Sequence, residues 1–179
     1  MDNYLKQYVE VINRMDMPDN VSADQVQRLF LDHIEIVNPS LEAVTLRPEG
    51  GDSETSKLSN LRFRIKELLE EIIKLVANSW NANPVALIWN AIQFVREVKK
   101  LATIDISKND AKVLYGLWVI KLEKPSDRWP TLEEIRNYLK NELTEEEVDV
   151  SLDNLRELGC IADEENGKYI FIKEEIVLN

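Results

Sequence analysis

The residues best suited to acid–base or metal chemistry are few in this chain of 179 residues. The only histidine, His33, lies between Asp32 and Glu35. A zinc-type site needs three or four converging ligands, and this stretch provides no more than the beginning of one. We therefore expect no metal site and no catalytic residue around His33.

Patterns for nucleophilic or phosphate chemistry are equally weak. The only cysteine, Cys160, follows Gly159 at the start of a predicted core strand, where a cysteine usually acts as a small buried hydrophobe. Gly50 and Gly51 lack the lysine and the spacing of a phosphate-binding loop. The sequence therefore predicts a protein that is not an enzyme and holds no cofactor.

An acidic helix, predicted over residues 144–158, is the most distinctive pattern. Thr144 and Glu147 have the spacing of a capping box, and Gly159 suits the left-handed residue that ends a helix. Acids in the first turn complement the helix dipole, which accounts for the run 145–147. The dipole does not account for three later acids, which we predict to contact a partner: Asp149, Asp153 and Glu157.

The negative charge of the chain is concentrated around this helix. The net charge is −11, from 33 acids and 22 bases. Residues 109–179 contribute −8 of it, with 17 acids and nine bases. A strongly negative surface repels nucleic-acid phosphates, so the charge favours a partner that is not DNA.

Residues 109–179 also have the element order of a known superfamily. The sequence predicts helices over 109–124, from Thr131 and from Thr144, and then a hairpin around Asn166-Gly167. The helix from 109 is expected to begin at a cap formed by Asn109 or Asp110. This order resembles the winged-helix superfamily. The resemblance implies a helix-turn-helix surface and a wing, which members use either to read DNA or to dock proteins.

Two functions follow from the resemblance, and the charge of the third helix ranks them. A helix-turn-helix reads DNA with its third helix, but the exposed positions here carry acids against the single base Arg156. We therefore expect a protein-interaction or assembly module, within a regulatory complex. The alternative is a DNA-binding transcriptional regulator that acts as a dimer, with these phosphate-contacting residues: Arg96, Lys99, Lys100, Lys108 and Lys112.

The four tryptophans divide into two pairs. Trp89 and Trp118 lie within apolar helix faces and are predicted to be core residues. Trp80 and Trp129 lie at helix breaks beside asparagine or proline. Partly exposed tryptophan is enriched in protein interfaces, so we predict that Trp80 and Trp129 contact a partner.

The remaining residues, 1–108, predict a helical N-terminal region. Helices are expected over 3–15, over 23–33, and from Pro84 to about residue 103, with a small β-hairpin at 33–46. The fold class is therefore mainly α (α+β), with a helical region at 1–108 and a winged-helix-like domain at 109–179. No signal peptide or membrane span is evident, and we expect a cytoplasmic location.

A heptad-like seam lies in the second half of this region. Its apolar residues recur at alternating steps of three and four, over about two and a half heptads. The seam is too short to establish a free coiled coil, so packing within the chain is the favoured interpretation. The alternative is a homodimer formed through Leu58, Leu61, Ile65, Leu68 and Ile72.

Overall fold

The computed structural model describes residues 3–37, 60–78, 80–123, 128–164 and 166–178. The described part is mainly helical, with short antiparallel strands, as the sequence predicts. Its helices are α1 (Asn3–Asn13), α2 (Ala23–Asp32), α3 (Ile65–Asn78), α4 (Pro84–Val98), α5 (Lys108–Glu123), α6 (Leu132–Leu139) and α7 (Glu145–Leu158). None of these helices is long and apolar enough to cross a membrane.

The strands form two small sheets in the described residues. One sheet has the order β1-β2-β5, and the other is the hairpin β3-β4. All pairs are antiparallel. The strands are β1 (Ile34–Val37), β2 (Asn60–Phe63), β3 (Ile161–Asp163), β4 (Ile170–Ile172) and β5 (Ile176–Val177).

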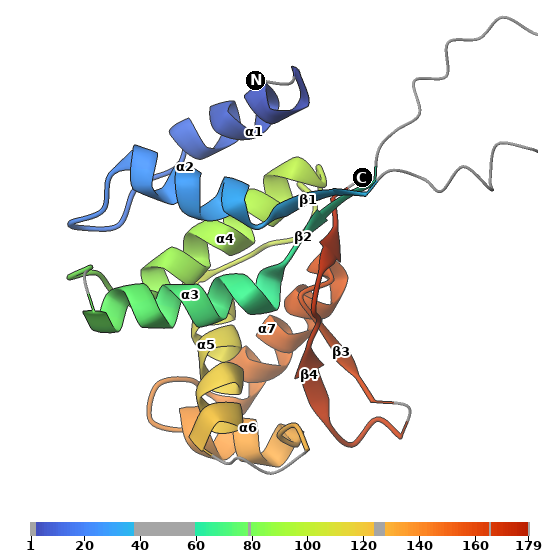
Figure 1. The fold of residues 1–179 in the computed structure, drawn as a ribbon. Coiled ribbons are helices and arrows are strands. Elements are labelled where there is room, and N and C mark those ends of the chain that lie inside the picture. Colours follow the sequence, from blue (N-terminus) through green and yellow to red (C-terminus); the bar gives the residue numbers. More distant parts are fainter. Residues whose placement is uncertain (1–2, 38–59, 79, 124–127, 165, 179) are drawn as a thin grey trace, which may run out of the picture.

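In Figure 1, α1 to α4 form the upper part of the molecule, and α5 to α7 lie below them. The upper helices pack around aromatic side chains because their apolar positions recur at helical spacing. Phe30, Phe63 and Phe94 are fully buried, with ring centroids 5.3 to 5.9 Å apart. Phe94 also meets the ring of Tyr8 edge-on at 5.9 Å. This cluster joins α1, α2, α4 and β2 into one core.

The predicted heptad seam is not one continuous helix. Leu58 lies outside the described residues, Leu61 belongs to β2, and α3 begins only at Ile65. Ile65, Leu68 and Ile72 have no exposed surface because they pack inside the chain. In this conformation they are not accessible to a second copy, so the seam is an internal one.

The predicted hairpin at 33–46 is described only in part. Residues 34–37 form a strand as expected, but the expected partner at 41–46 lies outside the described residues. In the described part, β1 pairs instead with β2, with Ile34 opposite Phe63 and Val37 opposite Asn60. The pairing thus joins segments that are distant in the sequence.

The C-terminal part has the predicted order of three helices and a hairpin. Both expected capping boxes are present, at Thr131 with Glu134 and at Thr144 with Glu147. Gly159 ends α7 with φ +83°, in the left-handed region. The hairpin β3-β4 projects at the lower right of Figure 1. A single bridge between Thr131 and Tyr169 places the start of α6 beside this hairpin.

The start of α5 differs from the prediction. Ser107, rather than Asn109 or Asp110, precedes the helix, and its hydroxyl oxygen accepts a hydrogen bond from the Asn109 backbone N–H. Asp110 lies inside the first turn and accepts a bond from the Ser107 backbone N–H at 2.8 Å. This exchange is typical of a reciprocal cap, and the sequence prediction missed it by choosing a residue two or three positions too late.

The two parts of the chain are joined at several places. Helix α4 packs along α5, and β5 pairs with β2, so the last described strand completes a sheet begun near residue 34. Ion pairs extend this junction: Arg62 with Glu175, and Lys66 with Glu174 at 2.5 Å. The buried side chains of both parts form one cluster.

Candidate interaction site

Helix α7 buries one face and exposes the other. Val148, Leu152, Leu155 and Leu158 recur at three- and four-residue steps and are buried against the rest of the chain. This stripe fixes the rotation of the helix. The opposite face, which carries the acids, is therefore directed to solvent.

Two of the three acids predicted to contact a partner are bound to arginines of the same chain. Asp149 accepts hydrogen bonds from Arg136 of α6, at 2.5 Å from Nη2 and 3.2 Å from Nε. Asp153 lies 2.8 Å from Nη1 of Arg156, whose Nε and Nη2 bind Asp163 of β3. The Asp149 contact connects α7 to α6, and the Asp163 contact connects α7 to the hairpin, whereas the Asp153 contact lies within α7. Asp149 therefore has a structural purpose that the sequence did not reveal.

Arg136 and Arg156 respond electrostatically to these acids. The hydrogen bonds that Arg136 donates to Asp149 raise the pKa of Arg136, and those that Arg156 donates to Asp163 raise the pKa of Arg156. Arg136 also lies 3.4 Å from Glu145. Both arginines are therefore occupied by carboxylates of the same chain.

A narrow exposed stripe remains on α7. Glu157, the third predicted contact residue, is exposed, as are Glu146 and Asp153. Among the described residues, Glu146 and Glu157 have no cation within ion-pair distance. Val150 lies between them with 54% of its surface exposed. Residues 146, 150, 153 and 157 follow one another at helical spacing, and we call them the acidic stripe.

Val150 was not among the residues predicted to contact a partner. Its position was the available signal: it falls outside the buried series 148, 152, 155 and 158, and a helix residue outside that series is directed to solvent. An exposed valine among acids gives the stripe a place for an apolar contact. The stripe can therefore bind a surface that offers both basic and apolar groups.

The five bases predicted to contact phosphate do not form one free surface. Nζ of Lys99 donates to the carbonyl oxygen of Leu158 at 2.8 Å, and Nη2 of Arg96 donates to that of Ala102 at 3.2 Å. Nζ of Lys112 lies 3.5 Å from Glu142. Burial lowers the pKa of Lys99. Of these five bases, only Lys100 and Lys108 are exposed and have no side-chain partner among the described residues.

Of the two tryptophans predicted to contact a partner, both are half-buried. Trp80 packs against the core at the end of α3. The ring of Trp129 lies 6.4 Å from that of Trp118, with Nζ of Lys121 5.3 Å from its centroid. Much of each ring is therefore used inside the chain. The predicted core position of Trp118 is confirmed, since 5% of its surface is exposed.

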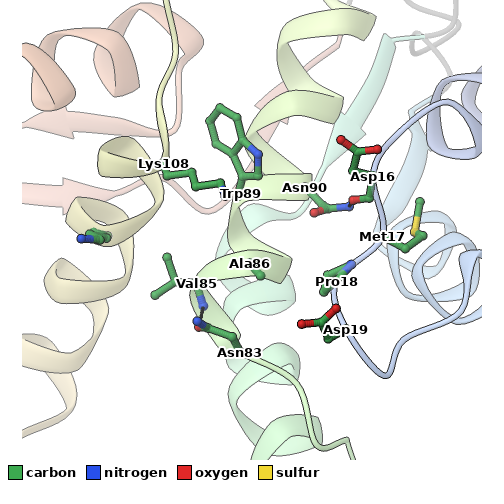
Figure 2. Close-up of a pocket in the computed structure, with 11 residues that line it drawn as sticks. Asp16, Met17, Pro18, Asp19, Asn83, Val85, Ala86, Trp89, Asn90 and Lys108 are labelled. Atoms are coloured by element: carbon green, nitrogen blue, oxygen red, sulfur yellow. Dashed lines mark hydrogen bonds between the residues drawn. The ribbon is translucent and has the colours of Figure 1, made fainter.

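Trp89 is not the core residue that its helix suggested. It is half-buried, and it lines a pocket of about 400 Å³ between the segment after α1, the first turns of α4 and the start of α5. Figure 2 shows its indole between Lys108 on one side and Asp16 on the other. The pocket is lined by Asp16, Met17, Pro18, Asp19, Asn83, Val85, Ala86, Trp89, Asn90, Lys108 and Lys112.

Hydrogen bonds hold two walls of this pocket in place. Asn90, which is 2% exposed, donates from Nδ2 to the backbone carbonyl of Asp16 at 3.0 Å. Asn20 donates to the carbonyl of Asn81 at 2.8 Å. The side chain of Asn83 caps α4 by accepting from the Val85 backbone N–H. A buried amide is costly unless it is bonded, so Asn90 fixes the segment that carries Asp16.

The side chains best suited to catalysis or metal binding, those of His33 and Cys160, do not form a common site. Nδ1 of His33 is 2.7 Å from the carbonyl oxygen of Leu29, and its Nε2 is 3.3 Å from Glu71. Burial raises the pKa of the Cys160 thiol to about 12, so little thiolate forms at neutral pH. Within the described ranges, no three His, Cys, Asp or Glu side chains converge as metal ligands.

A buried carboxylate links α5 to α7. Asp110 has no exposed surface, and Nδ2 of Asn154 lies 3.3 Å from both of its carboxylate oxygens. Ser107 and Ser151 are further hydrogen-bond partners. Burial raises the pKa of Asp110, while the bonds from these neighbours oppose that rise. The network positions α7, and Asp110 does not line the pocket beside Trp89.

The geometry therefore offers an exposed acidic stripe on α7 and a mixed-charge pocket beside Trp89. Comparisons with protein-family models, with curated proteins and with solved structures find no match to this chain.

Proposed function

We propose that this chain is a non-enzymatic protein-interaction or assembly module, with a C-terminal winged helix that docks a partner through the acidic stripe of α7. The observation that carries the proposal is Val150, which is 54% exposed between Glu146 and Glu157, two acids with no ion-pair partner in the described part of the chain. A partner that covers Val150 gains buried apolar surface, and its bases gain carboxylate contacts.

The order of elements supports the winged-helix part of the proposal. Helices α5, α6 and α7 are followed by the hairpin β3-β4, and Thr131 forms a bridge to Tyr169 in that hairpin. In such a module α7 occupies the position of the recognition helix. The partner surface is then the one that DNA-reading members direct to the major groove.

Charge argues for protein rather than DNA at this surface. The stripe brings carboxylates where a DNA reader needs donors to phosphates and bases. Lys99 and Lys112 are engaged within the chain, so few bases are left to offset the repulsion. We propose a cytoplasmic setting, and a regulatory complex is the context that this surface suits.

Charge reversal on the stripe tests the proposal. A tagged Glu146→Lys/Glu157→Lys variant, expressed in the cells that make the protein, is compared with the native chain by quantitative mass spectrometry of co-purified proteins. We expect specific partners to be lost from the variant. Glu10→Lys/Glu97→Lys is the matched control, because it makes the same charge change at exposed positions on α1 and α4.

Two results would overturn the proposal. One is that Glu146→Lys/Glu157→Lys retains all the co-purified partners while the control Glu10→Lys/Glu97→Lys loses them. The other is binding of duplex DNA that weakens steeply with salt, because such dependence reports neutralised phosphates. The second result would favour the DNA-binding regulator.

A further inference from the structure

The pocket beside Trp89 carries charged groups that the fold itself does not use. Among the described residues, the side chains of Asp16, Asp19 and Lys108 have no ion-pair or hydrogen-bond partner. Charged side chains are mostly exposed to water on a protein surface, and one without a partner is ordinary. Here, however, they line one pocket together with the half-buried indole of Trp89.

The charges are separated across the pocket. Figure 2 shows Asp16 and Asp19 on the segment after α1, and Lys108 on α5 at the other side of Trp89. A bound group of one charge would meet attraction at one wall and repulsion at the other. A ligand that carries both charges, separated by an apolar group, satisfies both walls at once.

The wall that holds the acids is built into the fold. Asn90 donates to the backbone carbonyl of Asp16 and is itself 2% exposed, so the one polar residue among the buried residues of α4 fixes this wall. A fixed wall lowers the ordering cost of binding. The indole of Trp89, which lies on the same helix one residue earlier, adds to the apolar surface of the pocket.

We propose that this pocket binds a short peptide segment of a partner, in which an apolar side chain lies between a basic and an acidic one. The apolar side chain packs on Trp89, the basic one reaches Asp16 and Asp19, and the acidic one reaches Lys108. A volume of about 400 Å³ is at the lower end for ligand pockets. It therefore takes a few side chains rather than a helix.

Lys112 has a supporting place in this arrangement. It lines the same pocket, but Glu142 lies 3.5 Å from its ammonium group. Its charge is partly neutralised within the chain, so Lys108 is the cation available to the peptide. The inference does not rest on the acidic stripe, because none of the four stripe residues lines this pocket.

The experiment is a titration of the full chain, labelled with ¹⁵N, by the blocked peptide acetyl-Arg-Leu-Glu-amide. The indole N–H signal of Trp89 is assigned from its loss in Trp89→Phe. We expect this signal to shift and to saturate with a dissociation constant of about 1 mM, which is typical of a small ligand with few contacts. Acetyl-Gln-Leu-Gln-amide, the neutral probe, should bind more weakly.

Variants separate the two walls. Asp16→Asn/Asp19→Asn should weaken binding about fivefold, and Lys108→Gln about threefold, as expected for exposed ion pairs. Asp16 is held through its backbone carbonyl, so the asparagine variant keeps that wall in place. Glu10→Gln/Glu97→Gln is the control for removal of two distant acids and should leave the titration unchanged.

The outcomes decide the inference. An unshifted Trp89 signal would overturn it, as would equal binding of the charged and neutral peptides or full binding by the Asp16→Asn/Asp19→Asn variant. Glu146→Lys/Glu157→Lys should bind the peptide normally. A stripe variant that loses cellular partners while retaining the peptide would show that the two surfaces act separately.

Discussion

Nζ of Lys99 donates a hydrogen bond to the carbonyl oxygen of Leu158 at 2.8 Å. Lys99 directly follows α4, and Leu158 is the last residue of α7. The last carbonyls of a helix have no partner within it, and the C-terminal end of a helix dipole attracts a cation. This contact thus ties the helix that carries the acidic stripe to the N-terminal part of the chain.

Replacing Lys99 with methionine should lower the free energy of unfolding. Methionine keeps most of the apolar stem but leaves the Leu158 carbonyl without its donor. We expect a loss of about 1 to 2 kcal/mol, the usual range for a hydrogen bond from a charged group at a helix end. Urea unfolding followed by circular dichroism measures it.

Lys100→Met is the matched control, because Lys100 is exposed and its side chain has no partner among the described residues. It should change the free energy of unfolding by no more than about 0.5 kcal/mol, as surface substitutions do. Equal losses in the two variants would contradict the role of Lys99 as a cap for α7.

We expect Asp110 to make a pH-dependent contribution to the free energy of unfolding. Its pKa is raised above the ordinary value of 3.8, chiefly by burial. The folded state therefore binds this proton more tightly than the unfolded state, and stability falls as the pH rises from 3.8 through the raised pKa. Asp110→Asn cannot titrate. As the pH rises, the unfolding free energy of the native chain should therefore fall relative to that of Asp110→Asn. Urea unfolding of both proteins, from pH values below 3.8 upward, measures this difference.

The partner of this carboxylate provides a second measurement. Asn154→Ala removes the amide that lies 3.3 Å from both oxygens of Asp110. We expect it to destabilise the fold by about 1 to 3 kcal/mol, since a buried acceptor loses its donor. Asn141→Ala, at an exposed asparagine, should cost less than about 0.5 kcal/mol. A pH-independent Asp110→Asn difference, or a harmless Asn154→Ala, would exclude this account.

Local signals in the sequence predicted much of the fold. The capping boxes at Thr131 and Thr144 and the left-handed Gly159 were predicted correctly, because each involves residues within four positions of one another. Asn166-Gly167 likewise marked the turn of the β3-β4 hairpin. The start of α5 was missed because Asp110 takes the position that Glu or Gln holds in the usual capping box.

Contacts between distant segments could not be predicted in the same way. The pairing of β1 with β2 and of β2 with β5 joins residues up to 115 positions apart, as Arg62 opposite Val177 shows. No local pattern encodes such a register. The same limit affected the site: Asp149 was expected to face a partner, but Arg136 on the preceding helix binds it. Trp89 was assigned to the core because the loop that forms its pocket is distant in the sequence.

Two glycines should respond to alanine in opposite ways. Gly159 has φ +83°, where a Cβ costs about 1 to 2 kcal/mol, so Gly159→Ala should destabilise the fold by about that amount. Gly116 lies inside α5, where alanine gains about 1 kcal/mol of helix propensity. Its added Cβ would lie 3.2 Å from the Tyr138 ring. That ring belongs to a residue with 43% of its surface exposed, so it can move aside, and Gly116→Ala should be neutral or stabilising.

Thermal unfolding of both variants tests this contrast. A clear destabilisation by Gly116→Ala would mean that Tyr138 is held firmly over the helix. In that case Gly116→Ala/Tyr138→Ala should lose less than the sum of the single changes, because the close contact has been removed.

The buried seam of α3 makes a final prediction about assembly. Ile72 has no exposed surface, so Ile72→Ala should lower the free energy of unfolding by about 2 to 5 kcal/mol through lost packing and the resulting cavity. Ile73, its half-buried neighbour, should lose less when changed to alanine. An internal seam also makes the melting temperature of the native chain independent of protein concentration. A dimer seam would instead make it rise with concentration, and Ile72→Ala would then lower the mass measured by analytical ultracentrifugation. A melting temperature that rises with concentration, together with a lower mass for Ile72→Ala, would contradict the internal packing of α3.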